Sequence, residues 1–266
     1  KQLTFIDIKC VNLKQIGKDA FSGCENMKEI HLPNTLTKIE MNTFKGCKNL
    51  EKIDIPNQLI EIQDYAFAEC KKLKKIILPT TVAKIGIGCF QKCTNLEVFA
   101  IPGIFAFYTN DDIPNIEAEL PPEKTFIIEK LCFSECISLK NLIIKKIKEL
   151  TIESSAFSSC NQLRDVKFDQ SESSQDNKII FKSSVFANCI SLTQFNFPPQ
   201  SDINDCSYLF DGCINLTTVD FPTNVVLICD GMFRNCESLP AIDMNRDTIT
   251  KIGNSAFQNC SKLVTK

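Results

Sequence analysis

The stretch LEKIDIPNQLIEIQDYAFAEC, residues 50–70, decides the fold, because variants of it recur along the chain. Each copy ends in the motif F-x-x-C, and the anchor phenylalanines are Phe21, Phe44, Phe67, Phe90, Phe133, Phe157, Phe186, Phe210, Phe233 and Phe257. Successive anchors are separated by 23, 23, 23, 43, 24, 29, 24, 23 and 24 residues. A repeat of this kind predicts a solenoid, since no unit can bury its apolar edge without its neighbours.

The first part of the unit, residues 50–56, alternates apolar and polar side chains around Asp54. This alternation predicts a short strand whose central side chain points away from the core. Pro56 lacks an amide hydrogen and should end the strand. Leu59 and Ile62 then turn inward from a second extended side.

The second part of the unit, YAFAEC at 65–70, places Phe67 and Cys70 three residues apart. That spacing predicts one helical turn with both side chains in the core. Phenylalanine and cysteine therefore recur because each fills the same core position in successive coils, where a free cysteine packs as a small hydrophobe.

The composition of the 266 residues is that of an ordinary soluble protein, with 44% apolar residues, 23% charged residues and a net charge of −2. The balanced charge gives no reason to expect nucleic acid as a partner, and no apolar run is long enough to span a membrane. The outliers are 15 cysteines, 20 phenylalanines and a single histidine, His31.

The unit resembles the BspA-type leucine-rich repeats of surface proteins from anaerobic bacteria and parasitic protists. The resemblance rests on LPNTLTKIEMNTFKGCKNL (32–50) and IPNQLIEIQDYAFAECKKL (55–73), and a period near 23 lies in the leucine-rich-repeat range. It implies a β-rich, right-handed α/β-type solenoid of about ten coils of 23–24 residues, with a parallel sheet on its concave face. It also implies a surface adhesion or ligand-binding role without catalytic residues. Cys10 replaces the proline of the first unit, and the units around Phe157, Phe186 and Phe210 fit the pattern less well.

We expect one solenoid over 1–266, a fragment of a longer chain, interrupted by a polar loop at 169–177 and a longer insertion at 103–122. The longer insertion, GIFAFYTNDDIPNIEAELPP, is predicted to be a loop that leaves the end of a strand. Long loops on rigid scaffolds often carry binding residues, here Phe105, Phe107, Tyr108, Asp111 and Asp112. Alternatively, its aromatic residues fold back onto the solenoid.

The outward side chain of each strand is polar at the two ends of the array and apolar in the middle. In chain order these residues are Asp7, His31, Asp54, Ile77, Ala100, Ile143, Lys167, Asn196, Asp220 and Asp243. Val98 extends the apolar middle, so Ile77, Val98, Ala100 and Ile143 form a candidate partner-binding strip. The alternative is that the insertion covers them and makes them core.

Ten cysteines, one in each F-x-x-C motif, form what we call the cysteine ladder: Cys24, Cys47, Cys70, Cys93, Cys136, Cys160, Cys189, Cys213, Cys236 and Cys260. Four of the other five make two candidate disulfides between adjacent units. Cys89 and Cys132 each precede an anchor, at a position that is otherwise apolar, so small core residues are the alternative. Cys206 and Cys229 stand four residues before their anchors, where the other units have glycine or polar residues, and are expected near the surface. Equivalent positions in stacked strands lie about 5 Å apart, within disulfide range. A zinc site formed by Cys89, Cys93, Cys132 and Cys136 is disfavoured, because C-x-x-x-C is not the usual zinc spacing.

No cofactor or metal is expected, and the motifs of hydrolases, phosphate loops and dinucleotide folds are absent from the sequence. The preferred function is a non-enzymatic cell-surface or secreted module that binds a protein or a glycan, of a host or of extracellular matrix, through the concave face and the 103–122 insertion. The alternative is a cytoplasmic protein-interaction scaffold with every cysteine reduced. The sequence leaves the oligomeric state open.

Overall fold

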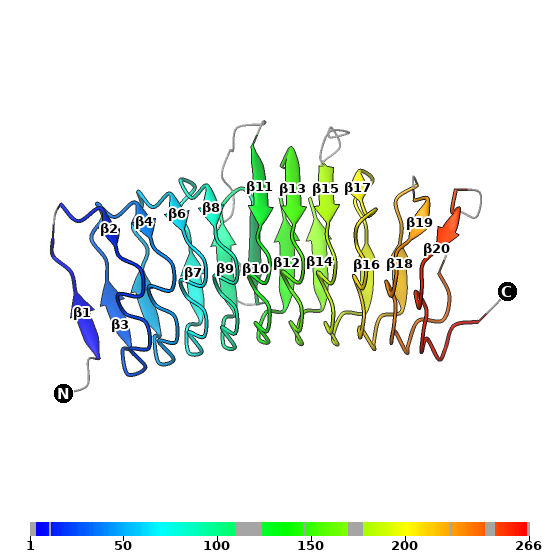
Figure 1. Cartoon of the computed structure of the whole chain (residues 1–266), viewed down its shortest axis with the longest axis horizontal. Helices are drawn as coiled ribbons and strands as arrows, with labels where there is room; N and C mark the ends of the chain where they lie inside the picture. Colours follow the sequence, from blue (N-terminus) through cyan, green and yellow to red (C-terminus); the bar gives the residue numbers. More distant parts are fainter. Residues whose placement is uncertain are drawn as a thin grey trace.

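In a computed structural model the chain winds into a single row of stacked coils, with the N-terminus and C-terminus at opposite ends (Figure 1). The structure describes residues 4–10, 12–109, 124–145, 147–169, 178–223, 225–242 and 248–264. The polar insertion therefore lies outside the described residues except for Asp169. These coils form about nine stacked turns, and the predicted ten are not confirmed.

Among the described residues, the first strands of successive coils and the inserted strand β10 lie in one long row, which we call the first row. Its members are β1 (Phe5–Asp7), β3 (Glu29–His31), β5 (Lys52–Asp54), β7 (Lys75–Ile77), β9 (Val98–Ile101), β10 (Phe105–Tyr108), β12 (Asn141–Ile144), β14 (Asp165–Phe168), β16 (Gln194–Asn196) and β18 (Thr218–Asp220). Its hydrogen-bonded sheets are β1-β3-β5, β7-β9-β10-β12-β14 and β16-β18. Apart from β10, every pairing is parallel, as the sequence predicts.

The second strands form a second row along another side of the coils (Figure 1). They are β2 (Gln15–Ile16), β4 (Lys38–Ile39), β6 (Glu61–Ile62), β8 (Lys84–Ile85), β11 (Thr125–Ile128), β13 (Glu149–Ile152), β15 (Lys178–Phe181), β17 (Ser201–Asp202), β19 (Leu227–Ile228) and β20 (Lys251–Ile252). Ile39, Ile62 and Ile85 pair in register and are buried, while the lysine or glutamate before each points outward. The two-residue alternation therefore fixes the register of this row as well.

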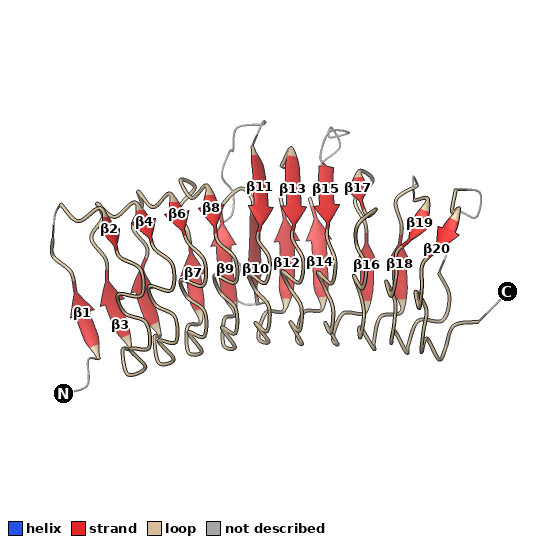
Figure 2. Ribbon diagram, in the orientation of Figure 1, coloured by secondary structure: helices blue, strands red, loops and turns tan. Residues whose placement is uncertain are grey.

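The third side of each coil carries the F-x-x-C motif and is a run of turns. The described residues contain no helix, so the predicted helical turn is not confirmed (Figure 2). The reason lies two residues before and two residues after each anchor. Both positions have a positive φ, as at Tyr65 (55°) and Glu69 (62°) around Phe67, and a left-handed residue ends right-handed helical propagation.

Because left-handed residues recur on this side, successive backbone amides point alternately toward the next coil and along their own turn. The amides of Tyr65, Phe67 and Glu69 donate to carbonyls of the next coil, and the Phe67 amide reaches Cys89 O at 2.9 Å. The amides between them donate within their own turn, as from Cys70 N to Phe67 O at 3.2 Å. This side therefore satisfies its polar backbone both within and between coils.

The anchor phenylalanines stack as a continuous ladder through the core. Neighbouring rings lie nearly parallel, with centroids 5.2 Å apart for Phe44–Phe67 and 5.9 Å apart for Phe186–Phe210. The ladder continues across the long insertion, since Phe90 and Phe133 stack at 5.6 Å. The insertion therefore leaves the coil stacking unbroken.

The start of the long insertion is a strand, and the prediction of a loop is wrong there. β10 turns back antiparallel to β9 and pairs on its other edge with β12, also antiparallel. Pro102 and Gly103 form the turn, with φ of +79° at Gly103 and a bond from Ile104 N to Ile101 O at 3.0 Å. Proline followed by a left-handed glycine is the signature of a type II turn. β10 thus fills the place between β9 and β12 in the first row.

Replacing Gly88, a left-handed glycine of the turn side, should destabilise the solenoid more than replacing Gly46. Gly46 has a φ of +72° and no close neighbour around a new Cβ, so Gly46→Ala should cost about 1–2 kcal/mol of backbone strain. Gly88 has a φ of +57°, and a Cβ there would also collide with the Tyr65 ring, which should add about 1 kcal/mol or more. Urea unfolding curves compare the variants, and equal losses would contradict the packing of Tyr65 on Gly88.

Candidate functional site

The outward face of the first row carries its side chains in strict register. Ile77 stands beside Ala100, Ala100 beside Ala106 of β10, Ala106 beside Ile143, and Ile143 beside Lys167. The structure therefore brings together three of the four predicted strip residues, joined by Ala106. Val98 lies on the same face of β9, two residues before Ala100.

The middle of this strip is buried. Ala100 and Ala106 are fully buried and form a small apolar cluster with the partly buried Ile143, separate from the main core. Val98 is 4% exposed, whereas Ile77 is 40% exposed. Ile77 and Ile143 thus keep solvent contact at the two margins of the strip, and Val98 and Ala100 do not offer an accessible surface.

Phe105 and Phe107 leave the candidate surface, because both side chains are fully buried on the inner face of β10. Phe107 lies 5.3 Å from both Phe133 and Phe157, ring centroid to ring centroid. Tyr108 is half-buried at the last position of β10 and pairs with Asn141 of β12. Asp111 and Asp112 lie outside the described residues.

A polar cluster near the N-terminal end of the same face surrounds the single histidine. His31 Nε2 lies 3.1 Å from Glu29 Oε1, and His31 Nδ1 lies 2.8 Å from Asp54 Oδ2. The exposed Phe5 ring meets the imidazole edge-on at 5.4 Å. Both imidazole nitrogens thus have a carboxylate neighbour within the chain. Among the described residues, no group of three or more His, Cys, Asp or Glu side chains could hold a metal ion.

The ladder cysteines act as hydrogen-bond donors between coils, a role that packing arguments from the sequence miss. Each thiol donates to the carbonyl of the anchor phenylalanine one coil earlier, at 3.1–3.2 Å, in Cys47, Cys70, Cys93, Cys136, Cys160, Cys189, Cys213, Cys236 and Cys260. Burial raises the pKa of these thiols, to about 12 for Cys93 and Cys189. The row is therefore structural and remains protonated at neutral pH.

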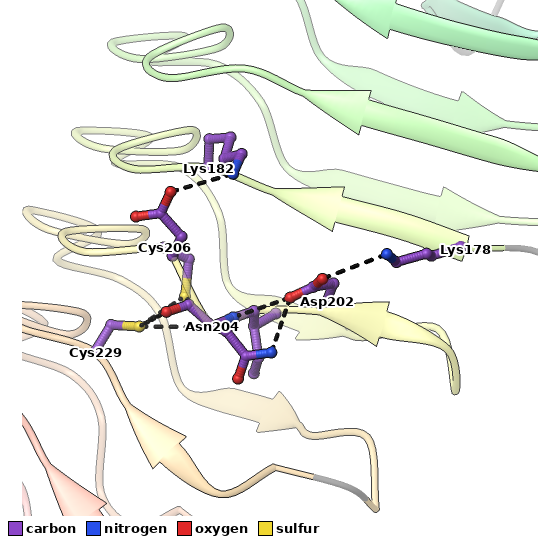
Figure 3. A network of polar contacts seen from close by, with 8 residues as sticks. Lys178, Lys182, Asp202, Asn204, Cys206 and Cys229 are labelled. Atoms are coloured by element: carbon purple, nitrogen blue, oxygen red, sulfur yellow. Dashed lines mark hydrogen bonds and ion pairs between the residues drawn. The ribbon is translucent and has the colours of Figure 1, made fainter.

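The two candidate cysteine pairs differ in their chemistry. The Sγ atoms of Cys206 and Cys229 lie 3.4 Å apart (Figure 3), so the predicted adjacency is correct. The prediction that they lie near the surface is wrong, because Cys206 is fully buried and Cys229 is 4% exposed. Cys89 and Cys132 also belong to successive coils and are buried, and desolvation raises the pKa of both. All fifteen cysteines are free thiols in the structure.

Comparisons with known proteins agree on the repeat. A family model described as "BspA type Leucine rich repeat region (6 copies)" matches residues 1–108, 103–205 and 179–265. Among solved structures, a leucine-rich repeat protein from Bacteroides ovatus is similar at 24% identity and a TM-score of 0.58, over 98% of this chain and 74% of that one. The pneumococcal vaccine antigen PcpA is similar at 20% identity and a TM-score of 0.53, over 86% of this chain and 59% of that one. No curated protein matches the chain at a significant level.

Proposed function

The chain belongs to the BspA-type leucine-rich repeat family, and from this premise we propose that it is a non-enzymatic binding module at the cell surface or in secreted form. It recognises a protein or a glycan through the outward face of the first row. A leucine-rich repeat array is suited to protein binding, because stacked coils present one extended, rigid surface. Among the described residues, no helix is long and apolar enough to cross a membrane.

The observation that carries this proposal is the accessible apolar side chain of Ile77, which is 40% exposed on the outward face of the first row. On one side of Ile77 along the row lies the cluster of Phe5, Glu29, His31 and Asp54. On its other side come the buried alanines, and beyond them Ile143 and Lys167. A partner that places an apolar group over Ile77 and donors over the carboxylates would match this surface. Carboxylates on separate strands and thiols within the core support binding rather than catalysis.

The alternative function is a cytoplasmic interaction scaffold that uses the same face. The cysteine ladder favours it, because nine thiols donate hydrogen bonds that only the reduced side chain can make. Both functions use the first row as the binding surface. They differ in the class of partner and in the cellular location of the protein.

Replacing Ile77 with glutamate should weaken partner binding by about tenfold or more while leaving the thermal midpoint unchanged, because the new carboxylate would be desolvated in the contact. Ile60 offers a matched control, since it is 51% exposed in the loop before β6 rather than on a first-row strand. The probes are a glycan array and immobilised extracellular matrix, read by surface plasmon resonance.

We expect Ile60→Glu to bind like the unmodified chain. Equal binding by both variants would move the site away from the first row. If the unmodified chain bound neither probe, the surface proposal would be contradicted, and the cytoplasmic scaffold would be preferred.

A further inference from the structure

We propose that Cys206 and Cys229 form a redox modification site, at which a neutral hydroperoxide converts two adjacent thiols into a disulfide that joins neighbouring coils. The two residues stand four positions before the anchors Phe210 and Phe233, in successive units. Their sulfur atoms are 3.4 Å apart, and the bond of a disulfide is about 2.05 Å. Closing the gap therefore takes roughly 1.4 Å of sulfur movement.

The hydrogen bonds of this pair differ from those of the ladder. The Cys206 thiol lies 2.9 Å from Ile203 O, and the Cys229 thiol lies 3.3 Å from the same carbonyl oxygen. One acceptor therefore holds both sulfurs on the same side of the coil, whereas each ladder thiol has the carbonyl of an anchor phenylalanine as its partner. The Cys206 thiol also lies within hydrogen-bonding distance of the Cys229 sulfur, at 3.4 Å.

Exposure and charge assign different roles to the two thiols. Cys229 has a small exposed fraction, while Cys206 is fully covered, so an oxidant meets Cys229 first. The hydrogen bond from Cys206 lowers the pKa of Cys229 to about 7, and the same contact raises the pKa of Cys206. Cys229 is therefore the nucleophile, and Cys206 is the thiol that resolves the intermediate.

The charges around the pair favour a small neutral oxidant. The negative charge of Asp205 acts to raise the pKa of both thiols, that of Asp230 acts to raise the pKa of Cys229 and that of Asp202 acts to raise the pKa of Cys206, so each of these carboxylates opposes a thiolate. Lys182 pairs with Asp205 at 3.1 Å and Lys178 with Asp202 at 3.6 Å, which offsets part of that charge (Figure 3). These carboxylates would repel an anionic disulfide such as oxidised glutathione, which is also too bulky to reach the covered sulfur. Hydrogen peroxide is uncharged and small.

The reaction balances with one peroxide for each disulfide. The Cys229 thiolate attacks a peroxide oxygen, the O–O bond breaks, and hydroxide leaves to give a sulfenic acid at Cys229. Cys206 then attacks that sulfur, and the S–O bond breaks as the S–S bond forms. The released hydroxide takes up the Cys206 proton, so two thiols and one hydrogen peroxide give one disulfide and two waters, counting the proton first lost by Cys229.

The test maps the disulfide in the unmodified chain. Reduced protein is treated with hydrogen peroxide, its remaining thiols are alkylated in denaturant, and it is cleaved before aspartate. Cleavage before Asp205 and Asp211 releases peptide 205–210, and cleavage before Asp220 and Asp230 releases peptide 220–229. Each peptide holds one cysteine of the pair. We expect them to appear as one cross-linked species, two hydrogens lighter than their sum and separable by reduction.

Cys89 and Cys132 serve as the internal control, because they also belong to successive coils and are buried, but both have raised pKa values. Their peptides, 64–110 and 112–164, should stay separate, and the protein should lose two of its fifteen free thiols. The proposal is overturned if peptides 205–210 and 220–229 are recovered singly and alkylated, or if Cys229 accumulates as a sulfinic acid without a cross-link.

The rate of cross-linking should rise with pH through about 7 and then level, because the thiolate is the nucleophile and Cys229 loses its proton over that range. Oxidised glutathione at the same concentration should act more slowly than peroxide. Oxidation should raise the thermal midpoint by about 5 °C or more in the unmodified chain and leave Cys229→Ser unchanged. A rate that is independent of pH between about 5 and 9 would remove Cys229 as the nucleophile.

Discussion

Phe133→Ala should lower the free energy of unfolding by about 3–5 kcal/mol, one of the two largest losses that we expect from a single substitution in this chain. Phe133 is fully buried and stacks between Phe90 and Phe157 at 5.6 Å on each side. Phe99 and Phe107 also meet its ring, at 4.8 and 5.3 Å between centroids. Truncation would leave a cavity that these rings cannot close without abandoning their own stacking.

Phe257 supplies the control for Phe133, since it occupies the same position of the repeat in the last described coil. Its ring is only partly buried and stacks with Phe233 at 5.5 Å. Phe257→Ala should therefore cost distinctly less, about 1–2 kcal/mol. Urea unfolding followed by circular dichroism measures both variants. Equal losses of unfolding free energy in the two variants would mean that the anchor phenylalanines in the middle of the array contribute no more to stability than the one in the last described coil.

Much of this architecture can be predicted from the spacing of a few residues. The regular return of phenylalanine and cysteine demands equivalent core positions, and the alternation around Asp54 gives the outward direction of each first strand. Parallel pairing then follows, because every unit runs in the same direction along the coil. These features depend on local periodicity, which is the strongest signal in a repeat sequence.

The turns are harder to predict, because side-chain identity gives a weak signal for left-handed backbone. Glycine occupies the left-handed position two residues before the anchor at Gly88, but Tyr65 and Leu131 occupy the same position in other coils. Stacking between coils holds these residues in a conformation that they would avoid in isolation. A single sequence shows the apolar spacing but not the backbone conformation, so the spacing predicts one helical turn where the structure has left-handed residues.

The exposure of Cys206 and Cys229 could not be predicted from their counterparts in other units. Glu40 and Gln63 hold the same position and are partly exposed, because long polar side chains reach solvent from it. A thiol is short and apolar, so the same backbone position leaves it buried. The polarity of equivalent residues therefore reports on their side chains and not on the site itself.

The insertion held a signal that the repeat pattern obscured. Proline and glycine stand between two apolar runs, VFAI and IFAFY, a combination that is typical of a hairpin. The anchor spacing marks residues 103–122 as extra, and it therefore predicts a surface loop there. In the structure, however, β9 and β12 are separated by one strand position of the sheet. β10 occupies that position, with Phe105 and Phe107 facing the core.

Phe107→Ala should accordingly destabilise the solenoid by about 3–5 kcal/mol, as a core truncation does, instead of acting on a binding surface. The ring of Phe107 is fully buried and packs against Phe133 and Phe157, so its loss leaves Phe105, at 6.0 Å from Phe133, as the ring of β10 that still contacts an anchor phenylalanine. Tyr108→Ala is the matched control, because the neighbouring side chain is half-buried and should cost about 1 kcal/mol or less. Urea unfolding compares the two variants.

Hydrogen exchange separates a strand from a loop at these residues without any substitution. Pairing of β10 with both β9 and β12 means that amides of Phe105–Tyr108 should exchange as slowly as those of β12. In Phe107→Ala the protection of both strands should fall together, since the hairpin loses the packing of Phe107 against Phe133 and Phe157. If these amides exchange as fast as free peptide, and Phe107→Ala unfolds at the same urea concentration as the unmodified chain, then β10 is not part of the sheet. Loss of protection confined to β10 would show instead that the coils are stable without it and that the hairpin is an addition to a core that is already complete.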